Sequence, residues 1–491
     1  MVEVPAKSTF TQVHATCTNS SSEKRVALYE KFKAKVSVNR ALKRELVSFQ
    51  ANKSVPFYAW FKYKEGFSES LVIYLLEYFK PRPRTLLDPF SGAGSALFAA
   101  NALGWHTQGI EVLPVGIYAT HARFVAQKIN PQVFRGVITK LKHVNFIDYY
   151  DQSYALKHIT ITRGAFPPVE EQQLIGYTAY CHRFVTDEDI REVLLYAAFC
   201  ILEAISYTRK DGQYLRWDAR SGRSQGKKVF NKGYIPPFCK AIDEKLQQMA
   251  LDLEARPIQQ NLFSDSFLPT IANSECELNE GSCLEILPTM EMNTIDFVLT
   301  SPPYANRYDY TRTYALELIY LGCNEEKVKQ LRQTMLSCTV ENKDKRAKLE
   351  ELYTSLEKKR EFQTIDTTFQ KQEALQEVLA LLETYRDQGK LNNQNIAKMV
   401  RNYFYEMSFV IYELARILKP GGIIVMVNDN VRYAGEEVPV DLILSEIAES
   451  FGLTTRHIWA LDRGKGNSSQ QMGNHGRTEL RKCVYVWEKL N

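Results

Sequence analysis

The sequence predicts an α/β protein in which one mostly parallel sheet carries two largely helical insertions. A strand, a helix and a second strand follow one another within residues 85–111, and so compact a unit requires parallel strands. The alternation then stops, resumes at 295–299 and continues beyond residue 396. The intervening stretches, 125–275 and 324–390, carry amphipathic or charged helical patterns and predict the two insertions.

The first elements follow from local signals. Residues 22–48 are rich in Lys, Arg and helix formers and predict a helical N-terminal arm. Apolar side chains recur at helical spacing from Leu71 to Phe79, and two prolines directly afterwards end that helix. The elements expected next are a short buried strand at 85–88, a helix at 96–100 that Gly104 ends, and a strand at 106–111.

The later elements are equally well marked. Within the first insertion the clearest helix is 190–207. A Lys-Pro-Gly-Gly sequence is expected to stop a long helix before the next strand. In order, the sequence predicts a strand at 295–299, a helix at 396–418, a strand at 423–427, a helix at 439–451, and strands at 455–461 and 482–487 around a loop rich in Gly, Ser and Asn.

Composition excludes several classes of protein. The 491 residues are 45% hydrophobic and 24% charged, as in soluble globular proteins, and their length suggests about three structural units. Nine cysteines are present without a CxxC pair, so zinc-finger and dithiol redox interpretations fail, and the eight histidines form no metal-binding cluster. The sequence shows neither a signal-peptide pattern nor a run of about 18 apolar residues, so we expect a soluble cytoplasmic protein.

The first motif with chemical content is Asp88-Pro-Phe-Ser-Gly-Ala-Gly-Ser95, which lies between a strand and a helix. Its two glycines allow a sharp turn and close approach of a ligand, beside the unpaired N–H groups of the helix start. Glu111 ends the next strand 23 residues after Asp88, the spacing at which an acid reaches ribose hydroxyls. The motif is neither GxGxxG nor a GK[ST] phosphate loop, and on the glycines alone a purely structural turn is the alternative.

The second motif, Thr300-Ser-Pro-Pro-Tyr304, follows the strand 295–299. Two prolines stiffen the turn and force extended backbone, so that a carbonyl can point into a cleft. The Ser301 hydroxyl and the Pro302 carbonyl would then be two acceptors for one NH₂ group, and Tyr304 a face for stacking. The alternative is a structural polyproline turn.

Together these motifs resemble those of the class I S-adenosylmethionine-dependent DNA amino-methyltransferases. The resemblance covers about half of the chain and implies a Rossmann-like seven-stranded sheet with a C-terminal antiparallel hairpin. It implies that the catalytic residues are Ser301, Pro302, Pro303 and Tyr304. The cofactor residues that it implies are Lys64, Phe67 and Ser68 at the methionine end, Asp88, Pro89, Phe90, Ser91, Gly92 and Gly94 in the turn, Glu111 on the ribose, and Ser282 and Cys283 near the adenine. Many members have Asp where this chain has Ser282.

The order of the motifs, cofactor before catalytic, resembles the family arrangement in which the target-recognition region is inserted between them. The expected organisation is a helical N-terminal arm (1–54), the cofactor half of the core (55–124), an inserted recognition region (125–275), the catalytic-motif part of the core (276–323), a helical insertion (324–392) and the C-terminal half of the core (393–491). The second insertion is nearly balanced in charge and is expected to be a solvated helical hairpin, with DNA clamping or subunit contact as the alternative.

Residues 208–240 contain nine basic residues against two acidic ones, with aromatic residues interleaved. Cations for phosphates and aromatics for bases or sugars are typical of nucleic-acid binding, although a solvated loop is the alternative. A Gly-rich C-terminal loop, 463–471, is also basic and is expected to border the catalytic cleft. The DNA-binding residues expected from both segments are Arg216, Arg220, Arg223, Lys227, Lys228, Lys232, Arg463 and Lys465.

The resemblance implies methyl transfer from S-adenosylmethionine to an exocyclic amine of a flipped base in double-stranded DNA. In the family that the motifs resemble, Ser at the first position of the catalytic motif is associated with N4 of cytosine, so N4 of cytosine is favoured and N6 of adenine is the runner-up. A guanine-N2 RNA methyltransferase and a catalytically silent nucleic-acid-binding protein remain weaker alternatives. C5 methylation is disfavoured because the sequence has no Pro-Cys pair. Any restriction activity would belong to a separate endonuclease, and the protein would associate with the nucleoid when bound to DNA.

Overall fold

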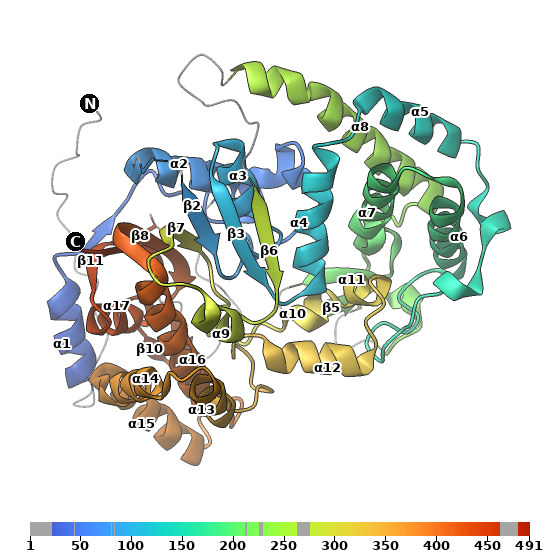
Figure 1. Cartoon of the computed structure of the whole chain (residues 1–491). Helices are drawn as coiled ribbons and strands as arrows, with labels where there is room; N and C mark the ends of the chain where they lie inside the picture. The colour runs from blue at the N-terminus through green and yellow to red at the C-terminus, as the bar shows by residue number, and fades with distance from the viewer. Residues whose placement is uncertain are drawn as a thin grey trace.

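The computed structural model describes residues 22–43, 45–79, 81–82, 84–211, 214–224, 229–262, 275–461 and 480–491. A sheet of eight strands crosses the molecule, in the order β1-β11-β12-β8-β7-β2-β3-β6 (Figure 1). The bounds of these strands are β1 Val36–Val38, β2 Thr85–Asp88, β3 His106–Glu111, β6 Cys276–Glu280, β7 Ile295–Thr300, β8 Leu418–Asp429, β11 Leu453–Ala460 and β12 Lys482–Lys489.

The predicted α/β fold is confirmed. Strands β8, β7, β2, β3 and β6 are parallel to one another, and β12 is antiparallel to both of its neighbours, β8 and β11. These seven strands are the expected sheet with its C-terminal antiparallel hairpin. The predicted strands 85–88 and 106–111 match β2 and β3 in both bounds.

The eighth strand comes from the N-terminal arm, which is helical only in part. Helix α1, Glu23–Phe32, is followed by β1, and β1 pairs in parallel with β11 at the edge of the sheet. Three residues of Val-Ser-Val carry too little pattern to predict a strand, and the open edge of β11 supplies the pairing partner.

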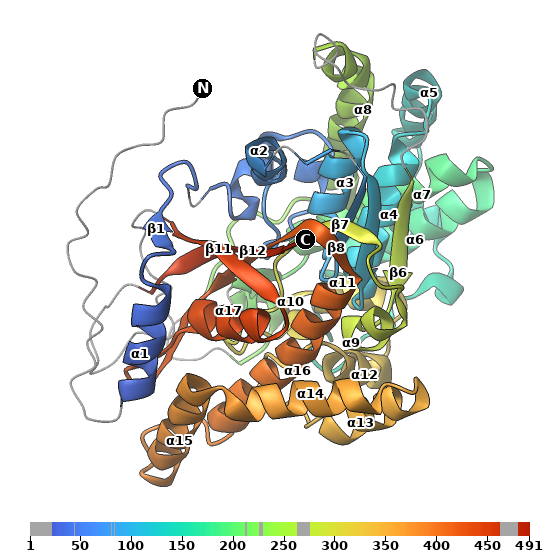
Figure 2. The ribbon, with the colours of Figure 1, turned by 60° about the vertical axis from the view of Figure 1, so that its left-hand side comes forward.

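Helices cover both faces of the sheet, because alternate residues of its strands point to opposite sides. Val425 and Val427 belong to one buried cluster, whereas Ile424 and Met426 belong to the other. The first cluster includes residues of α2 Glu69–Phe79, α3 Ser95–Ala102 and α4 Pro114–Ala126, and the second includes residues of α16 Ile396–Ile417 and α17 Val440–Ser450 (Figure 2).

Strand β8 begins earlier than predicted. It starts at Leu418 and includes the Lys-Pro-Gly-Gly sequence that was expected to be a break. The pairing with β7 moves from Leu418 opposite Ile295 to Ile423 opposite Phe297, so the extra residues form an irregularity within the strand.

The first insertion is helical with a small hairpin. Its helices are α5 Pro131–Leu141, α6 Pro168–Phe184, α7 Glu188–Ile205 and α8 Phe238–Leu262, and its hairpin joins β4 Thr208–Asp211 to β5 Tyr214–Trp217. Helix α7 packs against α4 and so ties the insertion to the core. Short 3-10 helices lie at Phe49–Ser54, Tyr58–Trp60, Phe146–Tyr149, Gln152–Tyr154, Ala219–Ser221 and Leu287–Thr289.

The second insertion packs beneath the sheet on α16 (Figure 2). It consists of α12 Glu325–Thr334, α13 Arg346–Ser355, α14 Lys359–Lys371 and α15 Glu373–Asp387. The remaining short elements are α9 Cys283–Ile286, α10 Tyr310–Thr313, α11 Ala315–Tyr320, β9 Val431–Tyr433 and β10 Glu436–Val438. Within the described residues, the helices lack the combination of length and apolar character that crossing a membrane would require.

Candidate functional site

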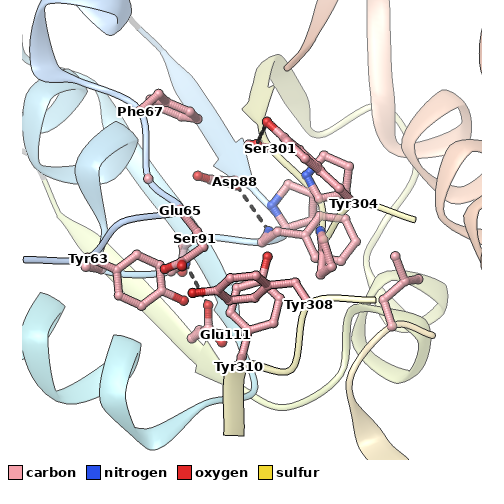
Figure 3. A pocket seen from close by; sticks show the side chains of 18 of the residues that line it. Tyr63, Glu65, Phe67, Asp88, Ser91, Glu111, Ser301, Tyr304, Tyr308 and Tyr310 are labelled. Atoms are coloured by element: carbon pink, nitrogen blue, oxygen red, sulfur yellow. Dashed lines mark hydrogen bonds between the residues drawn. The ribbon is translucent and has the colours of Figure 1, made fainter. Parts of the chain in front are cut away.

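A cavity of about 450 Å³ lies beyond the carboxyl ends of β2, β3 and β7 (Figure 3). Both sequence motifs line it, so residues more than 200 positions apart share one site. The predicted residues on its walls are Lys64, Phe67, Asp88, Pro89, Phe90, Ser91, Gly92, Glu111, Ser282, Cys283, Ser301, Pro302, Pro303 and Tyr304. Open parallel sheets bind ligands at this edge, where strand order reverses.

The turn at residues 88–95 requires its two glycines. Gly92 has φ +52°, and a Cβ there would lie 2.9 Å from the ring of Tyr63. Gly94 has φ +72°, and its Cβ would lie 2.5 Å from Thr120 Oγ1. A residue with a side chain would therefore be strained and would displace a neighbour at either position.

Glu111 is a buried carboxylate held by backbone donors. Its Oε2 accepts from the Gly92 N–H at 2.6 Å, and its Oε1 accepts from the N–H groups of Val112 and Leu113 at 2.9 and 2.8 Å. Burial raises the pKa of Glu111, and these hydrogen bonds oppose that rise. A carboxylate fixed in this way at a strand end suits hydrogen bonding to a pair of ribose hydroxyls.

Asp88 joins the two motifs. Its Oδ1 accepts from Thr300 Oγ1 at 2.7 Å and from the Phe90 N–H at 3.1 Å. Burial raises the pKa of Asp88 to about 7, even though both hydrogen bonds lower it. A cation bound beside it would favour the charged form, so the cavity is suited to a ligand with a positive group.

Another part of the cavity wall is formed by the start of α9. The hydroxyl of Ser282 accepts from the Leu284 N–H at 3.3 Å and caps this short helix. Cys283 beside it is 5% exposed, and burial raises the pKa of its thiol. A neutral buried thiol is a poor nucleophile.

The turn at residues 300–304 presents a hydroxyl and a ring to the cavity. Ser301 Oγ donates to the Val427 carbonyl at 3.1 Å and lies 3.3 Å from the Tyr304 hydroxyl, so its orientation is fixed by β8. Burial raises the pKa of Tyr304, which keeps the phenol neutral. The Lys482 ammonium lies 5.6 Å from the centre of the Tyr304 ring and 3.7 Å from Asp429 Oδ1.

Several wall residues were missed by the sequence analysis. Three tyrosines and a glutamate form a cluster at one side of the cavity: Tyr63, Tyr308, Tyr310 and Glu65 (Figure 3). Glu65 accepts from the hydroxyl of Tyr314, whose ring stacks on that of Tyr63 at 5.0 Å. The density of tyrosines at 304–314 was the available signal. Asn306, Met335, Leu336, Asp429, Asn430 and Lys482 also line the cavity.

Two of the predicted cofactor residues, Ser68 and Gly94, do not line the cavity but pack behind its wall. Ser68 is buried, donates to the Leu46 carbonyl at 2.7 Å and accepts from the Leu71 N–H at 3.2 Å. It thereby fixes the segment that carries Phe67. Gly94 is the N-cap residue of α3 and packs against α4, as its closeness to Thr120 shows.

The predicted DNA-binding residues make contacts within the first insertion. Arg216 lies 3.1 Å from Asp211 and 4.2 Å from the centre of the Phe230 ring. Arg220 pairs with Asp218 at 2.8 Å, and Arg223 lies 3.6 Å from the centre of the Trp217 ring.

Lys232 is more deeply engaged, because its ammonium donates to the carbonyls of Glu203, Ala204 and Ser206 at the end of α7. Burial lowers its pKa to about 8. Lys227, Lys228, Arg463 and Lys465 lie outside the described residues. The DNA contacts of all eight residues stay predictions.

The cavity therefore offers a buried carboxylate held at a strand end, a second carboxylate suited to a cation, apolar walls, and a hydroxyl with an aromatic face. This donor set fits a nucleoside with a cationic tail on one side and a flat amine on the other. Seven of the eight strands have the order expected of the class that the motifs resemble, and one of the seven, β12, is antiparallel to its neighbours, as that class requires. The fold is that of a Rossmann-like methyltransferase.

Comparison with known proteins gives the family. The chain is 46% identical over 469 residues to the Type II methyltransferase M.AvaI of Nostoc sp. and to that of Anabaena variabilis, covering 94% of this chain and 92% of each relative. It is 39% identical over 479 residues to the Type II methyltransferase M.BsoBI of Geobacillus stearothermophilus, covering 95% and 92%. No protein-family model matches the chain. The chain belongs to the family of Type II methyltransferases.

Proposed function

We propose that this protein transfers a methyl group from S-adenosylmethionine to N4 of cytosine in double-stranded DNA, as the modification enzyme of a restriction–modification system. The observation that carries the proposal is the shared cavity of the two motifs. Its volume of about 450 Å³ lies within the range of about 300–1,000 Å³ that small-molecule and cofactor sites occupy. The family membership supports the reaction class.

The residues on one side of the cavity fit the cofactor. Glu111 would accept from the ribose hydroxyls, and Ser282 and Cys283 would border the adenine. Asp88 and the segment of Lys64 and Phe67 would face the cationic methionine end. The bound cofactor supplies an electrophilic methyl group on a sulfonium.

The residues on the other side act on the amine. The lone pair of an exocyclic amine is delocalised into the ring, which makes the nitrogen a poor nucleophile. Ser301 donates its own hydrogen to Val427, so the lone pairs of its oxygen are available to an N–H of the base. Together with the Pro302 carbonyl it would localise the lone pair of the amine, and in-line placement supplies much of the rate.

Tyr304 would stack on a base that has left the duplex, since the target atom is not reachable inside the helix. A proton leaves the nitrogen after methylation, when it is acidic, so no strong base is required before attack. The neutral Tyr304 phenol and the Lys482–Asp429 pair border the space that the base would occupy.

The proposed recognition surface is the first insertion, with the basic stretch 208–240 on the phosphates. The partner that cuts unmodified DNA would be a separate endonuclease. This part of the proposal rests on sequence composition and on the family name of the relatives.

The decisive experiment is base-resolved modification analysis of DNA treated with the purified protein and labelled cofactor. N4-methylcytosine is the expected product, and Ser301→Ala and Tyr304→Ala should lower turnover while cofactor binding stays close to that of the wild type. N6-methyladenine as the product would move the assignment to the runner-up and leave the amine mechanism in place. Full activity in both variants would overturn that mechanism.

A further inference from the structure

A short segment of the second insertion, residues 335–338, forms part of the cavity wall. Met335 and Leu336 follow α12 directly, are buried, and line the cavity with the cofactor turn. Leu336 belongs to the same buried apolar cluster as Cys283 and Ala305. The second insertion therefore supplies apolar surface to a site whose other walls come largely from the sheet.

This segment is held in place by a buried ion pair. Glu406, in the middle of α16, accepts from the Ser337 N–H and from the Lys345 ammonium, both at 2.8 Å, and also from the Ser337 hydroxyl. The Lys345 ammonium also donates to the Met335 carbonyl at 2.8 Å. The side chains of Lys345 and Glu406 are 11% and 1% exposed, so their mutual hydrogen bonds compensate for lost hydration.

The same region contacts the loop that follows the catalytic turn. The Cys338 thiol donates to the Tyr308 carbonyl at 3.3 Å. Arg332 donates to Thr311 Oγ1 at 2.9 Å, and its Nε lies 3.0 Å from Asp309 Oδ2. Tyr308 also lines the cavity. A displacement of residues 335–338 would therefore change both the part of the wall that Met335 and Leu336 form and the part that Tyr308 forms.

We propose that Lys345 and Glu406 are positioning residues for methyl transfer, and that the second insertion serves to complete the cofactor pocket. The pair fixes the Met335 carbonyl and the Ser337 N–H, and this holds the side chains of Met335 and Leu336 against the bound cofactor. The inference rests on the proposed function, because it takes the ligand of this cavity to be S-adenosylmethionine.

The test compares cofactor binding with DNA binding in Lys345→Met, Glu406→Gln and the double variant. Calorimetry with S-adenosylhomocysteine should show an affinity about tenfold lower in each, as expected when hydrogen bonds to a charged group are removed. The KM for S-adenosylmethionine should rise in parallel, while the KM for duplex DNA stays near the wild-type value. Arg346→Met is the matched control, because its exposed pair with Asp366 lies on the same insertion away from the cavity.

The double variant separates positioning from stability. It leaves no uncompensated buried charge, so its unfolding midpoint should return toward that of the wild type, while its cofactor affinity stays low because the Met335 carbonyl no longer has its donor. Recovery of both quantities together would show that the pair is merely structural and would overturn the inference.

Leu336→Ala alters the cavity wall directly. It therefore tests the role of this wall even if a variant of Lys345 or Glu406 does not fold. It should show the same decrease in affinity, confined to the cofactor, and wild-type affinity in Leu336→Ala would refute the role of this wall. If the wild-type protein itself does not bind S-adenosylhomocysteine, the proposed function fails and not this inference alone.

Discussion

The two insertions differ in how the structure places the side chains that their sequences made prominent. The first, 125–275, contains the basic stretch 208–240, yet Lys210 pairs with Glu317 inside the protein and Lys232 caps α7. The second, 324–392, was expected to be a solvated hairpin, yet Met335 and Leu336 reach the cavity. The charge of a segment thus indicates what it can bind, whereas its tertiary placement decides which site it serves.

The largest loss of stability is expected from a substitution at the buried ion pair that joins the first insertion to the core. The Lys210 ammonium lies 2.5 Å from Glu317 Oε1 and 4.4 Å from the centre of the Tyr314 ring, and the two charged side chains are 2% and 1% exposed. Lys210→Met leaves a buried carboxylate without its partner and should cost about 3–5 kcal/mol of unfolding free energy in urea titrations. Arg209→Met, at the exposed neighbouring position of β4, is the control. A decrease in Lys210→Met no larger than in this control would show that the pair does not anchor the insertion.

The pH dependence of cofactor binding tests the side of the cavity that belongs to neither insertion. The pKa of Asp88 is raised to about 7, so its carboxyl is increasingly neutral below that pH, and binding a cationic ligand must then displace a proton. The affinity for S-adenosylmethionine should fall about tenfold per pH unit below pH 7. Calorimetry in two buffers of different ionisation enthalpy should detect proton release at pH 6. The profile should flatten in Asp88→Asn, and an unchanged profile in that variant would assign the titration to another group.

The salt dependence of DNA affinity should distinguish Lys227 and Lys228 from Lys232, although all three lie in the first insertion. Removing the charges of Lys227 and Lys228 should flatten the salt dependence of DNA affinity, by up to about 0.9 in log–log slope for each phosphate that is no longer neutralised. Lys232→Gln should instead reduce stability and leave the slope nearly unchanged, because its ammonium is bound to the end of α7. Filter binding across a salt series measures both slopes. Equal slopes in all variants would indicate that this stretch faces away from DNA.

The smallest loss of stability is expected from a substitution at an ion pair on the surface of the second insertion. Arg346 lies 3.1 Å from Asp366, with side chains that are 49% and 22% exposed. Arg346→Met should change unfolding free energy by less than about 1 kcal/mol, since water and salt screen such a pair. A destabilisation comparable to that of Lys345→Met would show that the buried and exposed pairs of this insertion do not differ in role.

Much of the cofactor side could be predicted from sequence because its signals are local. The apolar run and turn around Asp88, and the acid at the end of the next strand, set where β2 and β3 end, and parallel strands bring those ends to one edge. The catalytic turn followed in the same way from a strand and two prolines. Both motifs therefore share the cavity as expected, while the roles of their individual residues stay predictions.

The rest of the site was decided by contacts between distant segments. Tyr63 packs over Gly92, and Met335 reaches the wall because Glu406, 69 positions after Ser337, anchors the segment next to it. Strand β1 exists because β11 offers an edge. The sequence by itself determined the ends of β2 and β3, the two turns and the alternation of buried side chains, since these depend on backbone conformation and local burial. Only the tertiary structure decided which side chains close the cavity and which cations are already paired, because such contacts depend on how separate helices pack.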